Sequence, residues 1–136
     1  MQTPKTFIGA NALFGILFLF GLGSALSVAE AQTKIPSEKA CKENPPKDTV
    51  TQGACIATDR TKGNCQACHM IPGMPAYGDV APPLMGLKAR FDKVKLRVQV
   101  ADATVANPKS VMPPFGRHKI LSDEELDKVI EFLLTL

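Results

Sequence analysis

The clearest hydrophobic pattern lies at the end of the chain, where apolar residues recur every three or four positions. This spacing is typical of one buried face of an α-helix, and the residues are Leu126, Val129, Ile130, Leu133 and Leu134. Ser122 precedes the stripe as a candidate N-cap, and Glu125 stands three residues later to complete a capping box. Leu121 can pack on Leu126 across this cap as a hydrophobic staple. We therefore predict a helix after Ser122, with Phe132 off the stripe and available to the first helix or to a partner.

Weaker patterns predict other helices, separated by loops. Residues 84–105 carry apolar side chains at a period near 3.6, which predicts one or two short helices; these side chains are Leu87, Phe91, Val94, Val98 and Ala101. Residues 53–60 are a second candidate for a short helix. Prolines and glycines concentrate in residues 72–83 and 107–116, which favours loops there. The expected fold is all-α, with short helices, long loops and no internal repeat.

The start of the chain has a different character. Lys5 is the only charge before Glu30, the intervening residues are mostly apolar, and Ala29-Glu30-Ala31 offers small residues to a signal peptidase. This layout predicts a secretory signal peptide over residues 1–31. A retained membrane anchor is the alternative, because the apolar stretch is close to the length that spans a bilayer. In either case we expect the domain to lie in the periplasm. If the signal peptide is removed, we expect no membrane contact.

The rest of the chain is predicted to form one small domain. Residues 32–52 are rich in Lys, Pro, Thr and Glu and are interpreted as a loose N-terminal extension, which leaves residues 53–136 as the domain. With 7 Phe, 1 Tyr and no Trp in 136 residues, the core is thin, and a buried cofactor would add apolar surface. The net charge of +3 is too small to indicate nucleic-acid binding.

Cys65-Gln66-Ala67-Cys68-His69 is the motif that carries the chemistry. C-x-x-C-H is the pattern of c-type haem attachment, in which two thiols add to the porphyrin vinyl groups and the histidine ligates the iron. A thioredoxin-like site would need a βαβ surround, and a zinc site would need further closely spaced ligands. A disulfide between Cys65 and Cys68 would leave His69 unexplained. The motif therefore predicts one covalent haem c.

Cys41 and Cys55 are the other two cysteines. In an oxidising compartment such a pair usually forms a disulfide, and the loop that it closes would contribute roughly 3 kcal/mol of stability. The alternative is a free thiol that pairs with another chain or takes part in redox chemistry.

A second axial ligand has to come from elsewhere in the chain. Met70 and Met74 follow His69 too closely to reach the opposite face of the ring, and Met85 is still close. Met112 lies in the proline-stiffened loop of residues 110–114 and is the favoured ligand, because Met/His ligation is usual in cytochromes c. His118 is the alternative, and would give a bis-histidine site.

The proximal histidine needs a partner of its own. A metal-bound imidazole usually donates its other N–H to a carbonyl or carboxylate. The Pro82 carbonyl could accept this bond from His69, and Leu84 could pack on the ring. The predicted haem-binding residues are therefore Cys65, Cys68, His69, Met112, Pro82 and Leu84, with His69 and Met112 on the iron.

Several segments between about Gly53 and the C-terminus form a recognisable set. They are the haem motif with Gly63-Asn64 before it, Ala81-Pro82-Pro83-Leu84, Arg90-Phe91, Asn107-Pro108, Val111-Met112-Pro113-Pro114-Phe115-Gly116 and the final Phe132-Leu133-Leu134-Thr135-Leu136. Together these segments resemble the SoxX family, the small monohaem subunits of the SoxAX cytochrome of bacterial thiosulfate oxidation.

The resemblance implies a class I cytochrome c fold with His69 and Met112 as axial ligands. It also implies a SoxA partner, on which thiosulfate is joined to a cysteine of the carrier protein SoxYZ, and a soluble cytochrome c as electron acceptor. The implied activity is that of L-cysteine S-thiosulfotransferase, with this chain as the electron-transfer subunit and no catalytic residue of its own.

Two other functions remain open at this point. The chain could be a free periplasmic monohaem carrier unrelated to sulfur oxidation, or a haem sensor with an open coordination site. The basic run from Lys88 to Arg97 is either a solvated helix face, or a group of residues that docks on an acidic partner or pairs with the haem propionates.

Overall fold

The computed structural model describes residues 35–136, so the predicted signal peptide and the first residues of the predicted extension lie outside the described residues. The regular elements in residues 35–136 are all helices, with one isolated bridge between His69 and Ala81. The prediction of an all-α fold is thus confirmed. The helices are α1 (Glu38–Glu43), α2 (Thr49–Thr58), α3 (Leu87–Arg90), α4 (Lys93–Ala101) and α5 (Asp123–Leu133), with 3-10 turns η1 (Cys65–Ala67) and η2 (Ala103–Val105). None of the described helices is both long and apolar enough to cross a bilayer.

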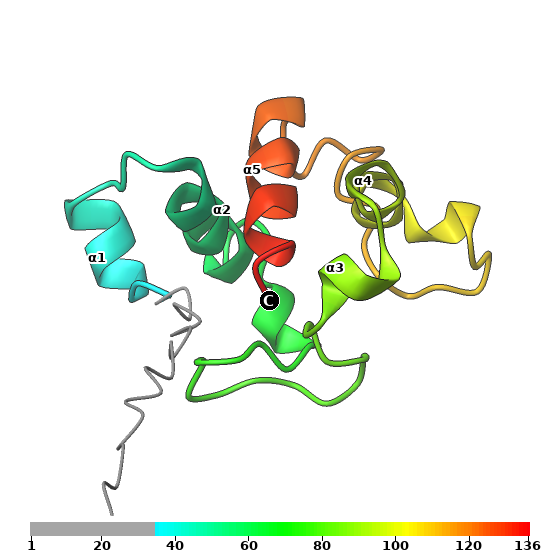
Figure 1. The fold of residues 1–136 in the computed structure, drawn as a ribbon, viewed down its shortest axis with the longest axis horizontal. Coiled ribbons are helices and arrows are strands. Elements are labelled where there is room, and N and C mark those ends of the chain that lie inside the picture. Colours follow the sequence, from blue (N-terminus) through cyan, green and yellow to red (C-terminus); the bar gives the residue numbers. More distant parts are fainter. Residues whose placement is uncertain (1–34) are drawn as a thin grey trace, which may run out of the picture.

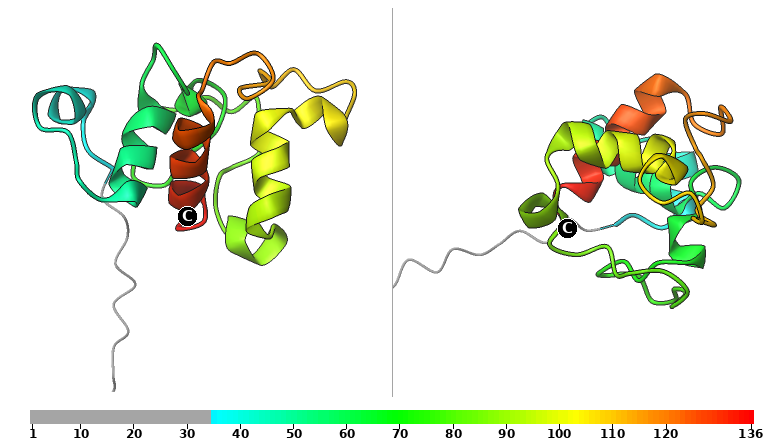
Figure 2. Two further views of the ribbon diagram at one scale, coloured as in Figure 1. Left: turned by 90° about the horizontal axis from the view of Figure 1, so that it is seen from above. Right: turned by 90° about the vertical axis from the view of Figure 1, so that its right-hand side faces the viewer.

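Helix α5 lies in the middle of the arrangement (Figure 1). Helix α2 packs on one side of it and α4 on the other, while α1 lies outside α2, and the view from above in Figure 2 shows the same order. The long loops that join α2 to α3 and η2 to α5 extend from this row of helices.

The start of α5 follows the predicted pattern. The Glu125 amide donates to Ser122 Oγ at 3.2 Å, and the Ser122 amide donates to Glu125 Oε2 at 3.0 Å, so the capping box is complete. Leu121 and Leu126 are both buried, as the staple requires. The capping residues therefore fix where this helix begins.

Phe132 is fully buried and packs toward α2. The two helices meet at Gly53, where an added Cβ would lie 1.9 Å from the Lys128 carbonyl oxygen and 3.0 Å from Phe132 Cβ. Only a residue without a side chain allows this approach. Of the two partners predicted for Phe132, the structure therefore supports the helix predicted over residues 53–60, which is α2.

The apolar stripe predicted over residues 84–105 is only partly correct. The helices are present, but Val94 and Val98 are 73% and 46% exposed, while Leu96 and Val100 are the buried residues of α4. The chain leaves the helix at Phe91, and the Asp92 side chain caps a new one by accepting from the Lys95 amide at 2.8 Å. This break resets the helical phase, so that residues on its two sides do not share a face.

Much of the basic run is paired inside the molecule. Arg97 bonds Asp127 at 2.6 Å and Asp123 at 3.0 Å, and Lys93 pairs with Glu131. These ion pairs join α4 to α5, so Lys93 and Arg97 already have acidic partners within the molecule.

The loose extension predicted for residues 32–52 contains regular structure. It includes α1 and the first residues of α2, which begins at Thr49 and not at Gly53. The Asp48 side chain accepts from the Thr51 amide at 2.8 Å and caps α2 four residues earlier than predicted. The apolar pattern does not reveal this start, because the buried residues of α2 are small: Gly53, Ala54, Ala57 and Thr58.

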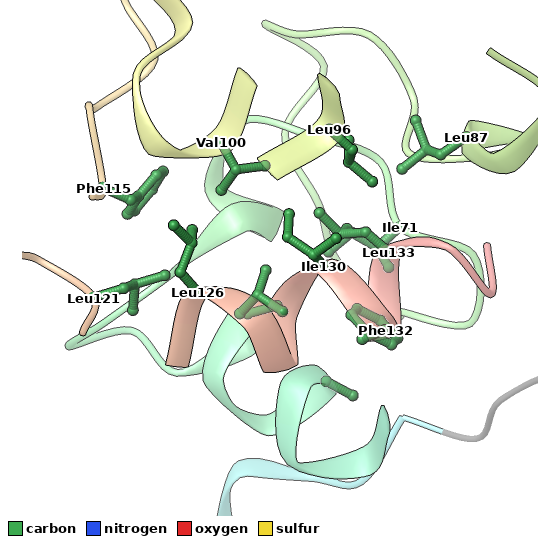
Figure 3. Packing of buried hydrophobic residues seen from close by; sticks show 13 residues of the cluster. Ile71, Leu87, Leu96, Val100, Phe115, Leu121, Leu126, Ile130, Phe132 and Leu133 are labelled. Carbon is green, nitrogen blue, oxygen red and sulfur yellow. The ribbon is translucent and has the colours of Figure 1, made fainter. Parts of the chain in front are cut away.

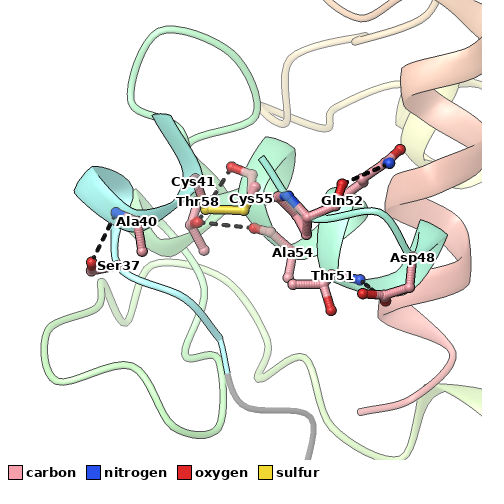
Figure 4. The surroundings of a disulfide bond; sticks show 10 residues. Ser37, Ala40, Cys41, Asp48, Thr51, Gln52, Ala54, Cys55 and Thr58 are labelled. Carbon is pink, nitrogen blue, oxygen red and sulfur yellow. Dashed lines mark hydrogen bonds between the residues drawn. A yellow bond between two sulfur atoms is a disulfide. The ribbon is translucent and has the colours of Figure 1, made fainter. Parts of the chain in front are cut away.

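A disulfide between Cys41 and Cys55 joins α1 to α2, which confirms the predicted pair. Figure 4 shows the bond between the two helices, and the Cα atoms lie 5.8 Å apart. No residue of α1 is buried. Because α1 buries no side chain, the disulfide is the main connection that holds this helix against α2.

The core gathers side chains from α2, α4, α5 and the loops between them (Figure 3). Its largest fully buried side chains are Phe132, Ile71, Leu121, Leu126, Ile130 and Val129. Ile71 and Phe115 come from the two long loops and are buried in the same cluster. These two residues tie the loops that carry the candidate ligands to the helices.

Candidate cofactor-attachment site

The C-x-x-C-H motif lies on a tight turn. Asn64 precedes it in the left-handed conformation with φ 45°, which asparagine tolerates better than most residues. The Cys68 and His69 amides both donate to the Cys65 carbonyl, at 3.2 and 2.9 Å. Cys65 is half-buried and Cys68 is exposed, and both are free thiols. The turn therefore presents two thiols and an imidazole in sequence.

The backbone on both sides of this turn comes very close to it. At Gly63, an added Cβ would lie 2.7 Å from the Ile56 carbonyl oxygen of α2. At Gly78, it would lie 2.1 Å from the Ala67 carbonyl oxygen. The two glycines thus allow α2 and the following loop to hold the turn from opposite ends.

His69 makes the predicted hydrogen bond. Its Nδ1 lies 2.6 Å from the Pro82 carbonyl oxygen, and since a carbonyl can only accept, Nδ1 carries the proton. The Leu84 amide donates to the Met70 carbonyl at 2.9 Å, and the Ala81 amide to the Cys68 carbonyl at 3.0 Å. These bonds hold residues 81–84 alongside the motif and leave the His69 Nε2 available to a metal.

The thiol of Cys65 is protonated at neutral pH. Burial raises its pKa to about 12, because a thiolate would lose its hydration there.

Met112 is half-buried in the loop before α5 and packs against the core cluster. Its amide donates to Ser110 Oγ at 3.2 Å, and the Phe115 amide donates to the Pro113 carbonyl at 2.9 Å. Of the alternative ligands, Met85 and His118 are exposed, whereas Met70 and Met74 are half-buried. Met112 is therefore the candidate on a stiff loop that is also anchored to the core.

The residues at this site fit a haem better than a bare metal ion. Among residues 35–136, no three His, Cys, Asp or Glu side chains converge as the ligands of a metal ion do. The two thiols and His69 are instead spread along one turn. Spread donors with a free imidazole nitrogen suit a planar group that is held at its edge and ligated at its centre.

Sequence reasoning missed three residues that shape this turn. Gly63 and Gly78 matter for the close approach of distant backbone, and Gln66 bonds the end of α2 through its side chain. In the C-x-x-C-H motif, Gln66 stands at a position that any residue can occupy. Its contact with Thr58 depends on the tertiary fold and has no signal in the local sequence.

Two comparisons relate this geometry to known proteins. Residues 50–133 match the family described as cytochrome C oxidase, cbb3-type, subunit III. Among solved structures, the chain is similar to the crystal structure of SoxXA from P. pantotrophus, with 28% sequence identity and a TM-score of 0.58. That similarity covers 66% of this chain and 82% of the other. No curated protein matches the chain.

Proposed function

The chain belongs to the cytochrome c family described as cbb3-type subunit III, and from this premise we propose that it is the monohaem electron-transfer subunit of a SoxXA-type complex. It has the all-α fold of a class I cytochrome c and is a SoxX-like electron-transfer cytochrome. The single observation that supports the complex is the similarity to SoxXA, which extends over most of that chain.

The proposed attachment uses the turn described above. Cys65 and Cys68 would hold haem c through thioethers, with His69 Nε2 and Met112 Sδ as axial ligands and Leu84 against the ring. The haem would supply a one-electron redox centre. The Pro82 carbonyl keeps the proton on His69 Nδ1 and fixes the orientation of the imidazole. The core anchors Ile71 and Phe115 hold the two ligand loops in place.

The proposed reaction takes place on the partner. A carrier cysteine thiol and thiosulfate would join through a new S–S bond, which releases one proton and two electrons. SoxA would hold the reacting groups, SoxYZ would provide the cysteine, and this chain would take the electrons one at a time. A soluble cytochrome c would then accept them, so the chain has no bond-making residue of its own.

The location follows from the proposed signal peptide over residues 1–31. We place the mature chain in the periplasm, where haem attachment to C-x-x-C-H and a stable disulfide are both chemically reasonable. The disulfide between Cys41 and Cys55 supports an oxidising compartment.

Purification from the native periplasm tests the complex. An affinity tag at the C-terminus should bring down a second haem protein in a 1:1 ratio, and thiosulfate with the carrier protein should reduce the haem of this chain. A lone monohaem band that thiosulfate cannot reduce would favour a free electron carrier. Protein without covalent haem would contradict the proposal at its first step.

A further inference from the structure

Gln66 lies between the two cysteines and turns its side chain inward. Its Nε2 donates to the Thr58 carbonyl oxygen at 2.8 Å. Its Oε1 is buried and has no hydrogen-bond partner among the described residues. A buried amide with one unpaired acceptor costs more than an apolar side chain of the same shape. The unpaired acceptor therefore offsets part of what the bond to Thr58 contributes to stability.

The acceptor of this bond is well fixed. Thr58 is the last residue of α2, where helix carbonyls have no partner within the helix. It is buried, and its Oγ1 donates to the Ala54 carbonyl at 2.9 Å. Because α2 is packed on α5 at Gly53, the bond connects the cysteine turn to this closely packed pair of helices.

The backbone of Gln66 is held from the opposite side. The Gly78 amide donates to the Gln66 carbonyl at 2.8 Å. Gln66 is thus bonded through its side chain to α2 and through its backbone to the loop after the motif. Two hydrogen bonds from opposite sides therefore hold the residue that follows Cys65 in the turn.

We propose that Gln66 is a positioning residue for haem attachment, which sets the thiols of Cys65 and Cys68 and the imidazole of His69 relative to the ring. The proposal rests on the covalent haem of the proposed function. Without the bond to Thr58, the turn keeps its backbone bonds, but the residue between the two thiols loses its link to the end of α2. One thioether would then form less completely, and the iron would sit in a changed ligand field.

The test compares two matched substitutions in the holoprotein. Gln66→Met keeps the length of the side chain and removes its hydrogen bonds. Gln52→Met is the control, because Gln52 Nε2 also donates to backbone carbonyls, those of Pro46 at 2.9 Å and Lys47 at 3.2 Å, away from the motif.

Three quantities are measured for each variant: the ratio of singly to doubly attached haem, the reduction potential and the thermal stability. The attachment ratio is read from the mass and from the absorption of the denatured haem. For Gln66→Met we expect the ratio of singly to doubly attached haem to rise about fivefold, as expected for the loss of one ordinary hydrogen bond, together with a shifted potential. Gln52→Met should leave both at the wild-type value.

Complete attachment and an unchanged potential in Gln66→Met would overturn the proposal, as would equal changes in both variants. If Gln66→Met does not accumulate, Gln66→Glu serves, because an ionised glutamate has no N–H to donate to Thr58 and must show the same rise in singly attached haem. A normal ratio in that variant would also overturn the proposal. A wild-type chain without covalent haem would instead contradict the proposed function, so the two failures are distinguishable.

Discussion

The Pro82 carbonyl decides which nitrogen of His69 can bind a metal. With Nδ1 engaged as a donor at 2.6 Å, only Nε2 is free, and the ring cannot rotate without losing the bond. Cys65 shows the same control by surroundings, because burial holds its thiol in the neutral form. At the scale of single residues, a backbone carbonyl thus fixes the tautomer of His69, and burial keeps the thiol of Cys65 protonated.

Met112→Ala tests the proposed second axial ligand. Removal of the thioether should lower the reduction potential, since methionine ligation raises it, and the ferrous protein should bind about one carbon monoxide per haem. Absorption spectra with and without carbon monoxide check this. Met74→Ala is the control, because Met74 is also half-buried against the core; the same carbon monoxide binding in both variants would count against Met112.

At the scale of elements, two contacts set the position of α5. Gly53 allows α2 to approach it, and Lys62 pairs with Glu125 in its first turn. Lys62 lies three residues before Cys65. The ion pair therefore also joins the segment before the motif to the first turn of α5. The same glutamate completes the capping box.

Gly53→Ala should destabilise the protein even though alanine favours helix formation. The new Cβ would meet the Lys128 carbonyl, and overpacking of this kind costs about 2 kcal/mol. Denaturant unfolding of the holoprotein measures the loss. Thr49→Ala, exposed in the same helix, should stay within about 0.5 kcal/mol of wild type. Equal stability of the two variants would show that the helices are not in close contact at Gly53.

Glu125 should make stability depend on pH. Its pKa lies below the ordinary value of 4.5, first because of the hydrogen bond from Lys62 and then because of the bond from the Ser122 amide. A lowered carboxyl pKa contributes stability above the unfolded value, and this contribution disappears as the pH falls through the folded one. Glu125→Gln should therefore lose about 1 kcal/mol at pH 7, and the difference from wild type should shrink below about pH 4.5.

Unfolding curves between pH 3 and pH 7 test this dependence. Glu124→Gln is the control, because it removes a charge from the same turn. The Glu124 carboxylate is largely exposed and pairs with Lys128. A difference between Glu125→Gln and wild type that stays constant over this range would contradict the assignment.

Elements with strong local signals were predictable from the sequence, and those that depend on distant contacts were not. The pair Ser122 and Glu125 predicts the start of α5 from the local sequence. The C-x-x-C-H motif from Cys65 to His69 likewise indicates the candidate attachment site. The start of α2 was missed because its buried side chains are small. The phase of α4 was wrong because the chain leaves the helix at Phe91 and Asp92 caps a new helix, a break that apolar periodicity does not show. Gln66 could not be found because its partner in α2 is adjacent only after folding.

At the scale of the whole molecule, a row of three helices supports two long loops. The core is continuous from α2 to α4, and Ile71 and Phe115 extend it into both loops. Helix α1 is the exception, because it buries no residue and is linked through the disulfide. The domain therefore has a well-packed body and one peripheral helix that depends on a covalent bond.

Cys41→Ser combined with Cys55→Ser should lower the free energy of unfolding by up to about 3 kcal/mol. The absorption spectrum and the reduction potential should not change, because in the described residues no hydrogen bond joins Cys41 or Cys55 to a predicted haem ligand. Hydrogen exchange should show lost protection in α1. Treatment of the wild type with a thiol reductant should reproduce the result, and an altered haem potential would show that α1 is coupled to the site.

The pairing of Cys41 with Cys55 also has a consequence for biogenesis. Four cysteines can form two disulfides in three ways, and each of them consumes the thiols of Cys65 and Cys68. The thiols of Cys65 and Cys68 are both free only in the fully reduced chain and in chains whose one disulfide joins Cys41 to Cys55, which is the pairing in the structure. For the proposed haem attachment, Cys41 and Cys55 have to be oxidised while Cys65 and Cys68 stay reduced in the same chain. The yield of mature protein then depends on the balance between the rate of thiol oxidation and the supply of haem.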